Sequence, residues 1–235
     1  MAATLYLIPV PLGATAPEAV LPAPVLEQIR PLTHFVVENA KSARAFLKAV
    51  GTAQPLQSLL LDELNEHTPH TALQKLLEPL LAGHDIGLVS EAGCPAVADP
   101  GADLVALAQK NGIRVVPLVG PSSLLLALMA SGLNGQRFAF LGYLPSKPME
   151  RAKALRNIEA ESRQHRQTQL FIETPYRNRP MLETLLATCQ PSTRLTLATD
   201  LTLPSESIVT LTIGEWKKRT PPDIERRPTV FLLLA

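Results

Sequence analysis

The sequence predicts an α/β protein of two α/β domains, the first on a mainly parallel sheet and the second on a mixed sheet. Apolar runs of strand length alternate with helix-like segments through the first half, which is typical of parallel strands joined by helices. In the second half the strand-like segments outnumber the helix-like ones. The length of 235 residues is enough for two small domains with cores of their own.

The first half contains four expected strand and helix pairs. Strands are expected at 5–10, 34–37, 86–89 and 113–119, and helices at 41–50, 71–82, 103–111 and 122–131. A glycine follows each of these helices, and glycine commonly ends a helix because it adopts the left-handed conformation freely. The best division of the chain lies near residues 118–121, so the predicted domains are 1–118 and 119–235.

The second half has a different pattern. Strands are expected at 137–141, 169–172, 195–198, 208–213 and 229–234, and helices at 150–164 and 180–188. Residues 207–213 alternate between apolar and polar side chains, as a half-exposed strand does. Such a strand favours a mixed sheet over a fully covered parallel one.

Composition limits the function classes. The net charge of +1 argues against a broad electrostatic nucleic-acid binder, although residues 1–118 carry a net charge of −4 and residues 119–235 one of +5. No apolar stretch has the length of a membrane span, and the N-terminus lacks a basic secretory leader, so a cytoplasmic location is expected. Cys94 and Cys189 form no CxxC pair and are expected to be two reduced thiols.

A metal site is not predicted. His67 and His70 in the segment HTPH are three residues apart, which is a spacing that two metal ligands on one helical face can have. Pro69 disturbs that helix, and no third ligand suggests itself. Solvated histidines are therefore the favoured interpretation.

Three loops carry the first functional signal. They are PVPLGAT (9–15), SEAGCPAVADPG (90–101) and VGPSS (119–123), and each follows an expected parallel strand. Ligands of open α/β sheets bind outside the carboxyl ends of the strands. Glycines at 13, 93 and 120 allow close backbone approach, and the loops contain no lysine or arginine. They therefore suit a neutral or cationic cofactor, such as a nucleoside that carries a sulfonium, better than a triphosphate.

Two familiar chemistries lack their motifs. The chain has no Walker A sequence and no GxGxxG sequence, which are the two common phosphate cradles. Ser122 follows a strand and opens a helix, as a hydrolase nucleophile does, but GPSSL lacks the last glycine of the GxSxG elbow. A helix-capping role is the favoured interpretation of Ser122.

The order of motifs resembles a known family. Along the chain these are LYLIPVPLG, VVEN, LNE, DIGLVSEAGCPAVADPG, GIRVVPLVGPSSLLLALMASGL, RFAFLGYLPSK, LFIETPYR and LATDLT. The chain thereby resembles the tetrapyrrole-methylase superfamily of S-adenosylmethionine-dependent methyltransferases. Within it, the resemblance is greatest to the bacterial 16S ribosomal RNA cytidine 2′-O-ribose methyltransferases, the small-subunit methyltransferase I group. The match covers nearly the whole chain.

The resemblance implies both a cofactor and a set of site residues. It implies S-adenosylmethionine in the cleft between two α/β domains, commonly in a homodimer. The implied cofactor contacts are Pro11, Leu12, Gly13, Glu91, Ala92, Gly93, Pro95, Val97, Ser122, Ser123, Glu173, Thr174, Pro228 and Thr229. On the substrate side the candidate bases are Glu38, Glu66 and Asp200. Lys41 is expected to steady a phosphate or a developing oxyanion.

Departures from the family pattern leave the acceptor open. EDTR becomes Glu38-Asn39-Ala40-Lys41, which replaces an arginine fork by a lysine point charge, and RELTK becomes TDLTL at 199–203. GNL becomes GAT at 13–15, and YExxHR becomes IETPYR at 172–177. Methyl transfer to a ribose hydroxyl of ribosomal RNA is the main hypothesis, with the small ribosomal subunit as a possible partner. The alternatives are a cofactor-binding paralogue without catalysis and a methylase of a tetrapyrrole or another small molecule.

One expected helix favours RNA mildly. Its basic residues are Arg151, Lys153, Arg156, Arg163 and Arg166, and they do not share one clean face.

Overall fold

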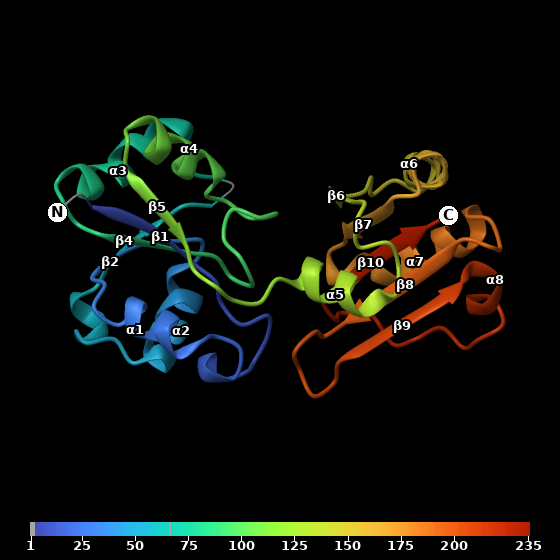
Figure 1. Ribbon diagram of the computed structural model, residues 1–235, viewed down its shortest axis with the longest axis horizontal. Coiled ribbons are helices and arrows are strands. Elements are labelled where there is room, and N and C mark those ends of the chain that lie inside the picture. The colour runs from blue at the N-terminus through green and yellow to red at the C-terminus, as the bar shows by residue number, and fades with distance from the viewer. Residues whose placement is uncertain (1–2, 66) are drawn as a thin grey trace. The chain divides into compact units, whose positions relative to one another are not determined.

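The computed structural model describes residues 3–65 and 67–235 and consists of two compact units. Unit 1 is Met1–Ser122 and unit 2 is Ser123–Ala235. Each unit contains one five-stranded sheet with helices on both of its faces (Figure 1). The predicted class of two α/β domains is confirmed. Within the described part of the chain, no helix is long and apolar enough to cross a membrane.

The sheet of unit 1 is parallel throughout, as expected. Its strands are β1 (Thr4–Ile8), β2 (His34–Val37), β3 (Leu60–Glu63), β4 (Ile86–Val89) and β5 (Arg114–Pro117). They lie in the order β3-β2-β4-β1-β5, so β4 and β5 are the two neighbours of β1. All four residues of β4 are buried, because helices cover the sheet on both faces.

Two pairs of helices cover the faces of this sheet. The helices are α1 (Ala23–Ile29), α2 (Ala40–Val50), α3 (Leu73–Leu81) and α4 (Ala102–Lys110). Helices α1 and α2 share one apolar core with the sheet, and α3 and α4 share the other (Figure 1). The side chain of Asn39 caps α2 by accepting hydrogen bonds from the backbone nitrogens of Lys41 and Ser42, at 2.9 and 3.3 Å. Helix α2 therefore begins directly after the end of β2.

The sheet of unit 2 is mixed, as expected. Its strands are β6 (Phe138–Tyr143), β7 (Thr168–Ile172), β8 (Arg194–Thr199), β9 (Ser207–Thr212) and β10 (Thr229–Leu234). The order is β6-β7-β10-β8-β9; β6 and β7 are parallel, and the other pairs are antiparallel. The last strand of the chain therefore lies in the middle of the sheet.

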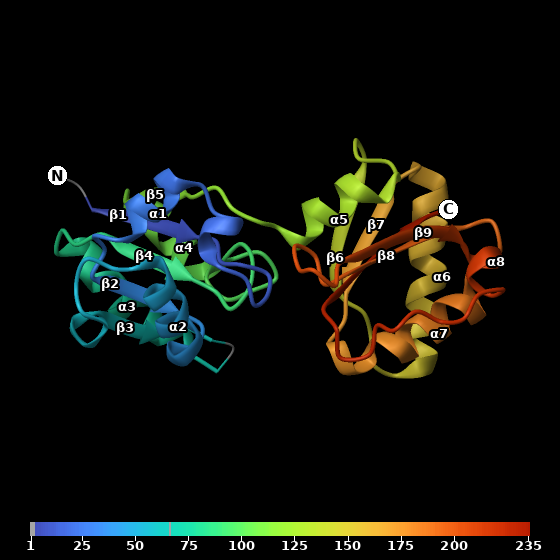
Figure 2. The ribbon, with the colours of Figure 1, turned by 90° about the horizontal axis from the view of Figure 1, so that it is seen from below.

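The helices of unit 2 also lie on both faces of its sheet (Figure 2). They are α5 (Ser123–Ser131), α6 (Pro148–His165), α7 (Asn178–Thr188) and α8 (Ile213–Trp216). Leu155, Met181 and Trp216, from α6, α7 and α8, share one buried core with β8 and β10. Helix α5 packs against β8, β9 and β10 on the other face (Figures 1 and 2).

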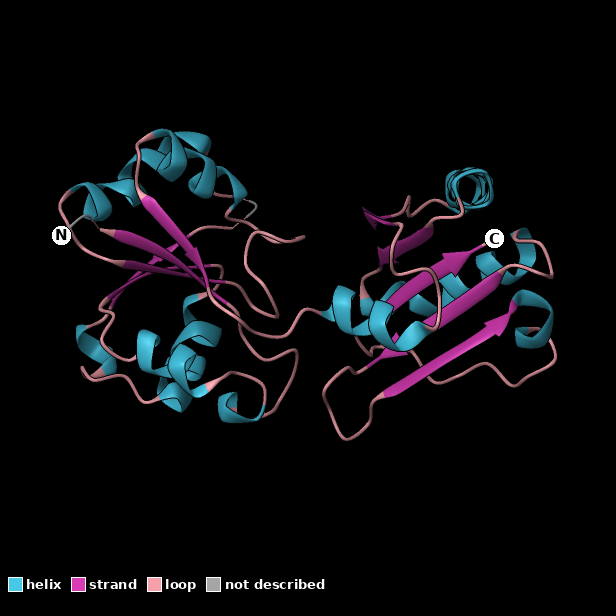
Figure 3. Ribbon diagram, in the orientation of Figure 1, coloured by secondary structure: helices cyan, strands magenta, loops and turns pink. Residues whose placement is uncertain are grey.

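Among the α-helices and strands, which Figure 3 distinguishes by colour, three were not predicted. Helix α1 begins at prolines, which look like loop residues in the sequence but are well tolerated in the first turn of a helix. Strand β3 is a four-residue edge strand with largely exposed side chains and thus has almost no periodic pattern. Helix α8 is also four residues long, and its capping box of Thr212 and Glu215 is the signal that would have revealed it.

Candidate functional site

The three predicted loops of unit 1 meet at the carboxyl edge of its sheet. They follow β4, β1 and β5, which are neighbours, so the topology brings them together. Val10 and Gly93 exchange backbone hydrogen bonds with N···O distances of 2.9 and 3.1 Å. The thiol of Cys94 donates a hydrogen bond to the carbonyl of Pro121, with an S···O distance of 3.5 Å. We call this set of loops, residues 9–15, 90–101 and 118–122, the first loop cluster.

Two glycines allow these loops to pack against one another. A Cβ atom on Gly120 would lie 2.3 Å from Cγ of Pro9 and 2.9 Å from Cδ2 of Leu21. Gly93 has a φ of 73°, and a Cβ atom there would lie 3.1 Å from Cδ2 of Leu12. Glycine was expected here so that backbone could approach a ligand, but the space that these two glycines leave is occupied by neighbouring loops of the protein itself.

Three carboxyl groups lie near one another at this edge of the sheet: those of Glu91 and Asp99 in the first loop cluster and that of Glu38, which follows β2. The backbone nitrogen of Glu91 donates to Oε2 of Glu38 at 3.1 Å, so the residue that follows β2 reaches the loop that follows β4. Burial of Asp99, together with the negative charges of Glu38 and Glu91, raises its pKa from 3.8 to about 6. At neutral pH, Asp99 is therefore a carboxyl group with a pKa close to that of a useful general base.

Asp99 is a residue that sequence reasoning missed. It was interpreted as part of the turn that leads into α4, because DPG is an ordinary turn sequence. Nothing in the local sequence shows that Glu38, in a loop far away along the chain, faces it.

A small pocket lies beside the carboxyl groups, between the first loop and α2. Its volume is about 230 Å³. It is lined by Val10, Pro11, Gly13, Thr15, Pro17, Ser42, Ala43, Ala45, Phe46, Ala49, Ser90 and Glu91. The hydroxyl of Ser42 donates to Oε1 of Glu91 at 3.2 Å. We call this cavity the α2 pocket.

Ser90, which lines the α2 pocket, has an unusual hydroxyl group. The residue is only 7% exposed, and its Oγ forms no hydrogen bond of good geometry with any described residue. The hydroxyl of Ser90 lies close to the carboxyl group of Asp99. This polar contact lowers the pKa of Asp99, although its geometry is not that of a good hydrogen bond. Buried hydroxyl groups normally have a full partner, so this one is available to a ligand.

The other substrate-side residues of unit 1 are less informative. Lys41 is exposed in the first turn of α2, where its backbone nitrogen is held by Asn39. Glu66 lies outside the described residues. The neighbouring Asn65 lines a second cavity of about 250 Å³, together with Thr68 and Gly101.

The side chain of His70 is also outside the described part, and the side chains that are described contain no group of three or more that could hold a metal ion.

The predicted site residues of unit 2 also meet at one edge of a sheet. Strand β10 runs antiparallel between β7 and β8, with Thr229 opposite Thr199 and Val230 opposite Ile172. The residues that follow β7 and β8 therefore lie beside those that precede β10. We call residues 173–177, 199–206 and 223–229 the second loop cluster.

Glu173 is held within the second loop cluster by an arginine. Its side chain is fully buried, and Oε1 accepts hydrogen bonds from Nε and Nη2 of Arg177 at 2.9 and 2.6 Å. The backbone nitrogen of Thr174 donates to the same oxygen at 2.7 Å. The other oxygen, Oε2, is buried without a hydrogen-bond partner among the described residues. It is an acceptor that a ligand can use.

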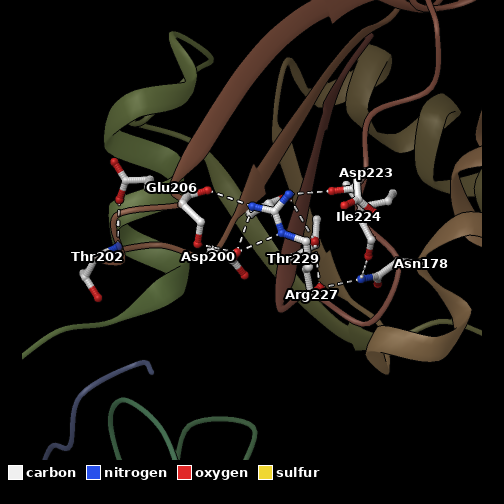
Figure 4. Close-up of polar contacts among 10 residues, drawn as sticks. Asn178, Asp200, Thr202, Glu206, Asp223, Ile224, Arg227 and Thr229 are labelled. Atoms are coloured by element: carbon white, nitrogen blue, oxygen red, sulfur yellow. Dashed lines mark hydrogen bonds and ion pairs between the residues drawn. The ribbon is translucent and has the colours of Figure 1, made fainter. Parts of the chain in front are cut away.

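Asp200 is held by a second arginine (Figure 4). Its Oδ2 accepts hydrogen bonds from Nε of Arg227 and from the hydroxyl of Ser205, each at 2.8 Å. Arg227 also donates to the backbone carbonyls of Ser205 and Asp223, each at 2.7 Å (Figure 4). This geometry is that of a structural ion pair, which favours an anchoring role for Asp200 over the role of base that the sequence predicted.

Backbone strain is concentrated in the two loop clusters. The described non-glycine residues with positive φ are Ala96, Ala98, Arg166, Asp200, Thr202 and Arg226. All of these except Arg166, which ends α6, lie in the two clusters. Such conformations persist only where the surrounding structure holds them, and they occur preferentially at functional sites.

Comparisons with known proteins agree on the class of protein. Residues 5–217 match the family model described as Tetrapyrrole (Corrin/Porphyrin) Methylases. Two similar proteins are the ribosomal RNA small subunit methyltransferases I of Escherichia coli O157:H7 and of Xylella fastidiosa strain Temecula1. The first is 34% identical and the alignment covers 98% of this chain and 77% of the relative. The second is 33% identical, with coverages of 99% and 81%.

Similar solved structures support the same fold. The methyltransferase CobJ aligns with a TM-score of 0.63 at 21% identity, over 99% of this chain and 93% of the other. The cobalt precorrin-4 methyltransferase CbiF aligns with a TM-score of 0.60 at 14% identity, over 98% and 94%.

Proposed function

The chain belongs to the tetrapyrrole methylase family of methyltransferases, and we propose that it transfers a methyl group from S-adenosylmethionine to a ribose hydroxyl of small-subunit ribosomal RNA. The observation that carries the choice of acceptor is the 34% identity, over 98% of this chain, to a relative named ribosomal RNA small subunit methyltransferase I. The family description names tetrapyrroles, and a tetrapyrrole acceptor is the alternative.

The chemistry of both loop clusters supports S-adenosylmethionine as the methyl donor. The first cluster contains carboxylates and no lysine or arginine, which favours a ligand with positive charge. In the second cluster, the buried Oε2 of Glu173 lacks a hydrogen-bond donor among the described residues. The ligand carries ammonium, amino and hydroxyl donors, any of which suits such an acceptor. The individual cofactor contacts, from Pro11 to Thr229, are part of this proposal.

The residues of unit 1 supply the acid–base chemistry in this proposal. When bound, S-adenosylmethionine supplies an electrophilic methyl group: the new oxygen–carbon bond forms while the carbon–sulfur bond breaks. The ribose hydroxyl must lose its proton as it attacks, and Glu38 and Asp99 are the carboxyl groups placed together to accept it. The exposed ammonium of Lys41 is free to steady a nearby phosphate. Much of the rate enhancement then comes from holding the hydroxyl in line with the leaving group.

The exposed face of α6 supports an RNA acceptor. Lys153, Arg156 and Arg163 are exposed, and none forms an ion pair within the described residues. Their spacing places them within one broad face of a helix, where they would make sequence-independent contacts to phosphates. Arg151 was predicted to be one of the basic residues on this helix that favour RNA, but it does not belong to the exposed face. It is buried, and its Nε donates to the hydroxyl of Thr184 at 3.0 Å.

Partners and location follow from the same proposal. A ribosomal RNA acceptor implies the small ribosomal subunit as the partner and the compartment that holds ribosomes, the bacterial cytoplasm, as the location. A homodimer is part of the proposal by resemblance to the family, and sedimentation of the purified chain would test it.

Tritium transfer tests the acceptor. The chain is incubated with S-adenosylmethionine labelled on its methyl group and with small ribosomal subunits, naked RNA or a tetrapyrrole in parallel. Label in the RNA of the subunits, mapped to a ribose, is the expected result. Label in the tetrapyrrole alone would replace the proposed acceptor, and cofactor binding without label in any acceptor would support a paralogue that has lost catalysis.

Charge variants test the α6 face. Replacing Lys153, Arg156 and Arg163 together by glutamine should weaken RNA binding and lower the slope of log affinity against log salt by about 2. Replacing Lys217, Lys218 and Arg219, which are exposed elsewhere in unit 2, by glutamine is the matched control. Equal losses in the two triple variants would contradict a specific role for α6.

A further inference from the structure

We propose that the hydroxyl group of Ser90 passes the proton of the attacking acceptor hydroxyl on to the carboxylate of Asp99. As the acceptor oxygen bonds to the methyl carbon, its proton moves to Oγ of Ser90 and the proton of Ser90 moves to Asp99, while the electrons of the broken carbon–sulfur bond stay on sulfur. The serine therefore ends the step uncharged. This inference rests on the proposed function, because it assumes a hydroxyl acceptor, and it adds a residue that was not among the predicted site residues.

The backbone around Ser90 is held on both sides. Ser90 directly follows β4, whose four residues are buried. The carbonyl of Val89, just before it, accepts a hydrogen bond from the backbone nitrogen of Glu38 at 3.2 Å. The backbone nitrogen of Glu91, just after it, donates to the side chain of Glu38 at 3.1 Å. A side chain at such a fixed strand end keeps its position more precisely than one on a free loop.

Ser90 connects a cavity with a carboxyl group. It lines the α2 pocket, whereas Asp99 is not among the residues that line this pocket. The hydroxyl of Ser90 also lies close to the carboxyl group of Asp99. A ligand hydroxyl in the α2 pocket can therefore meet Ser90, and through it reach Asp99. Glu91 lines the pocket as well, but one of its carboxylate oxygens already accepts a hydrogen bond from Ser42.

The hydroxyl of Ser90 has the capacity that this role requires. A serine hydroxyl can donate one hydrogen bond and accept two, so it can donate to Asp99 and accept from a ligand at the same time. Ser131 and Ser162, which are also buried, each donate to a backbone carbonyl at 2.8 Å. Ser90 is 7% exposed and forms no such bond with any described residue. Its hydroxyl is therefore not used to hold the fold together.

The charge state of Asp99 makes it a suitable end point for the proton. Burial and the negative charges of Glu38 and Glu91 raise its pKa to about 6, so it is mostly ionised at neutral pH but holds a proton more firmly than an ordinary carboxyl group does. The contact with Ser90 acts in the opposite direction and lowers the pKa. Loss of the hydroxyl should therefore both interrupt the proton path and raise the pKa of Asp99.

A titration tests the contact without requiring methyl transfer. The side-chain carboxyl carbons of the aspartates in the full chain are labelled with carbon-13 and followed by NMR as the pH is changed, and Asp99→Asn identifies the signal of Asp99. In wild type this signal should titrate at a pH of about 6, and Ser90→Ala should move the midpoint to higher pH. Ser58→Ala, which removes an exposed hydroxyl elsewhere in unit 1, is the matched control and should leave the midpoint unchanged.

Methyl transfer to small ribosomal subunits tests the proton path itself. Ser90→Ala should lower kcat about a hundredfold and leave the KM of both substrates nearly unchanged, because it removes a group that acts in the transition state. Wild-type activity should fall as the pH is lowered through about 6, where Asp99 becomes protonated, and the residual activity of Ser90→Ala should fall at a higher pH. Ser90→Thr keeps the hydroxyl and should restore most of the activity, and Ser58→Ala should match wild type.

Binding of S-adenosylhomocysteine, measured by calorimetry, separates the possible results. It should be unchanged in Ser90→Ala. The proposal would be overturned by an unchanged kcat or an unchanged Asp99 titration in that variant. It would also be overturned if S-adenosylhomocysteine binding fell as much as kcat, since Ser90 would then belong to the donor site. If wild type labelled no acceptor, a shifted titration with unchanged S-adenosylhomocysteine binding would support the contact between Ser90 and Asp99 and count against the proposed acceptor.

Discussion

Acidic residues lie at or beside the loop cluster of each unit, on segments that follow sheet strands, and the two units give them opposite surroundings. In unit 1, Glu38, Glu91 and Asp99 face one another, and burial together with their mutual repulsion raises the pKa of Asp99 to about 6. In unit 2, Glu173 is paired with Arg177 and Asp200 is paired with Arg227. The difference shows that the partners of an acidic residue at a sheet edge decide its role. Other carboxyl groups make it a candidate base, and an arginine makes it a structural anchor.

Removing the arginine partner in unit 2 should have the largest effect. Arg227→Met would leave the carboxylate of Asp200, which is 9% exposed, buried without its ion pair. Because an unpaired buried charge is costly and Arg227 itself is partly exposed, we expect the free energy of unfolding to fall by about 3 kcal/mol. Urea denaturation at neutral pH measures this loss.

A second substitution makes this test of the comparison decisive. Asp200→Asn should reduce stability but retain methyl transfer per folded molecule if Asp200 is an anchor. If a folded Asp200→Asn variant lost more than about a hundredfold in activity, Asp200 would instead be the base. The proposed contrast between the two units would then be wrong. Arg219→Met, at an exposed position of the same unit, is the control and should change stability by less than about 0.5 kcal/mol.

Crowding the first loop cluster should have the next largest effect. Gly120→Ala places a methyl group 2.3 Å from the ring of Pro9, and the ring cannot turn away as a flexible side chain can. We expect a loss of about 2 kcal/mol in stability, together with weaker binding of S-adenosylmethionine in calorimetry. Gly135→Ala is the matched control, because a Cβ atom there meets nothing within 4 Å. Similar losses in both variants would show that close loop packing is not the reason for Gly120.

Removing a carboxyl group from the cluster in unit 1 should stabilise the protein, in contrast to unit 2. The pKa of Asp99 rises from 3.8 to about 6 on folding, so the folded state binds the proton more tightly. The contribution of Asp99 to stability is therefore complete below pH 3.8 and is lost as the pH rises through 6. Asp99→Asn should match wild type at pH 3.5 and exceed it at pH 8 by about 1 kcal/mol, allowing for solvent around a half-buried group.

Thermal or urea unfolding across this pH range measures the difference between Asp99→Asn and wild type. Asp85→Asn is a suitable comparison, because Asp85 accepts a hydrogen bond from the backbone nitrogen of Thr4. This variant should be less stable than wild type, because the hydrogen bond is weakened. A loss of stability at pH 8 in Asp99→Asn would mean that the negative charge of Asp99 is favourable in the fold. The proposed contrast between the clusters would then be wrong.

The sequence predicted the fold well because the signals were local and repeated. Four of the five strands of unit 1 and all five of unit 2 were expected near their observed positions, since buried strands are continuous apolar runs. The three loops of the first cluster were expected together because strands of a parallel sheet end at the same edge. Strand β3 and helix α8 were missed because each is four residues long and, unlike the equally short β2 and β4, neither is a continuous apolar run.

The chemistry of the site was less predictable, because it depends on pairs that are far apart in sequence. Asp200 is a predicted base on sequence, and only its contact with Arg227, 27 residues later, favours an anchoring role. Asp99 looked like a turn residue, and its raised pKa comes from burial and from the nearby charges of Glu38 and Glu91, none of which the local sequence shows. Arg151 was counted among the surface charges of α6, although its contact with Thr184 of α7 buries it.

The smallest effect should come from Cys94, which also lies in the first loop cluster but takes no part in its charge balance. Burial and the nearby charge of Asp99 raise the pKa of the thiol, so it stays protonated and unreactive at neutral pH. Cys94→Thr keeps a donor for the carbonyl of Pro121, now as a hydroxyl, in place of the 3.5 Å thiol contact. We therefore expect stability within about 0.5 kcal/mol of wild type and unchanged cofactor binding. Rapid modification of Cys94 by a thiol reagent at pH 7, or loss of methyl transfer in Cys94→Thr, would instead make the thiol a functional group of this cluster.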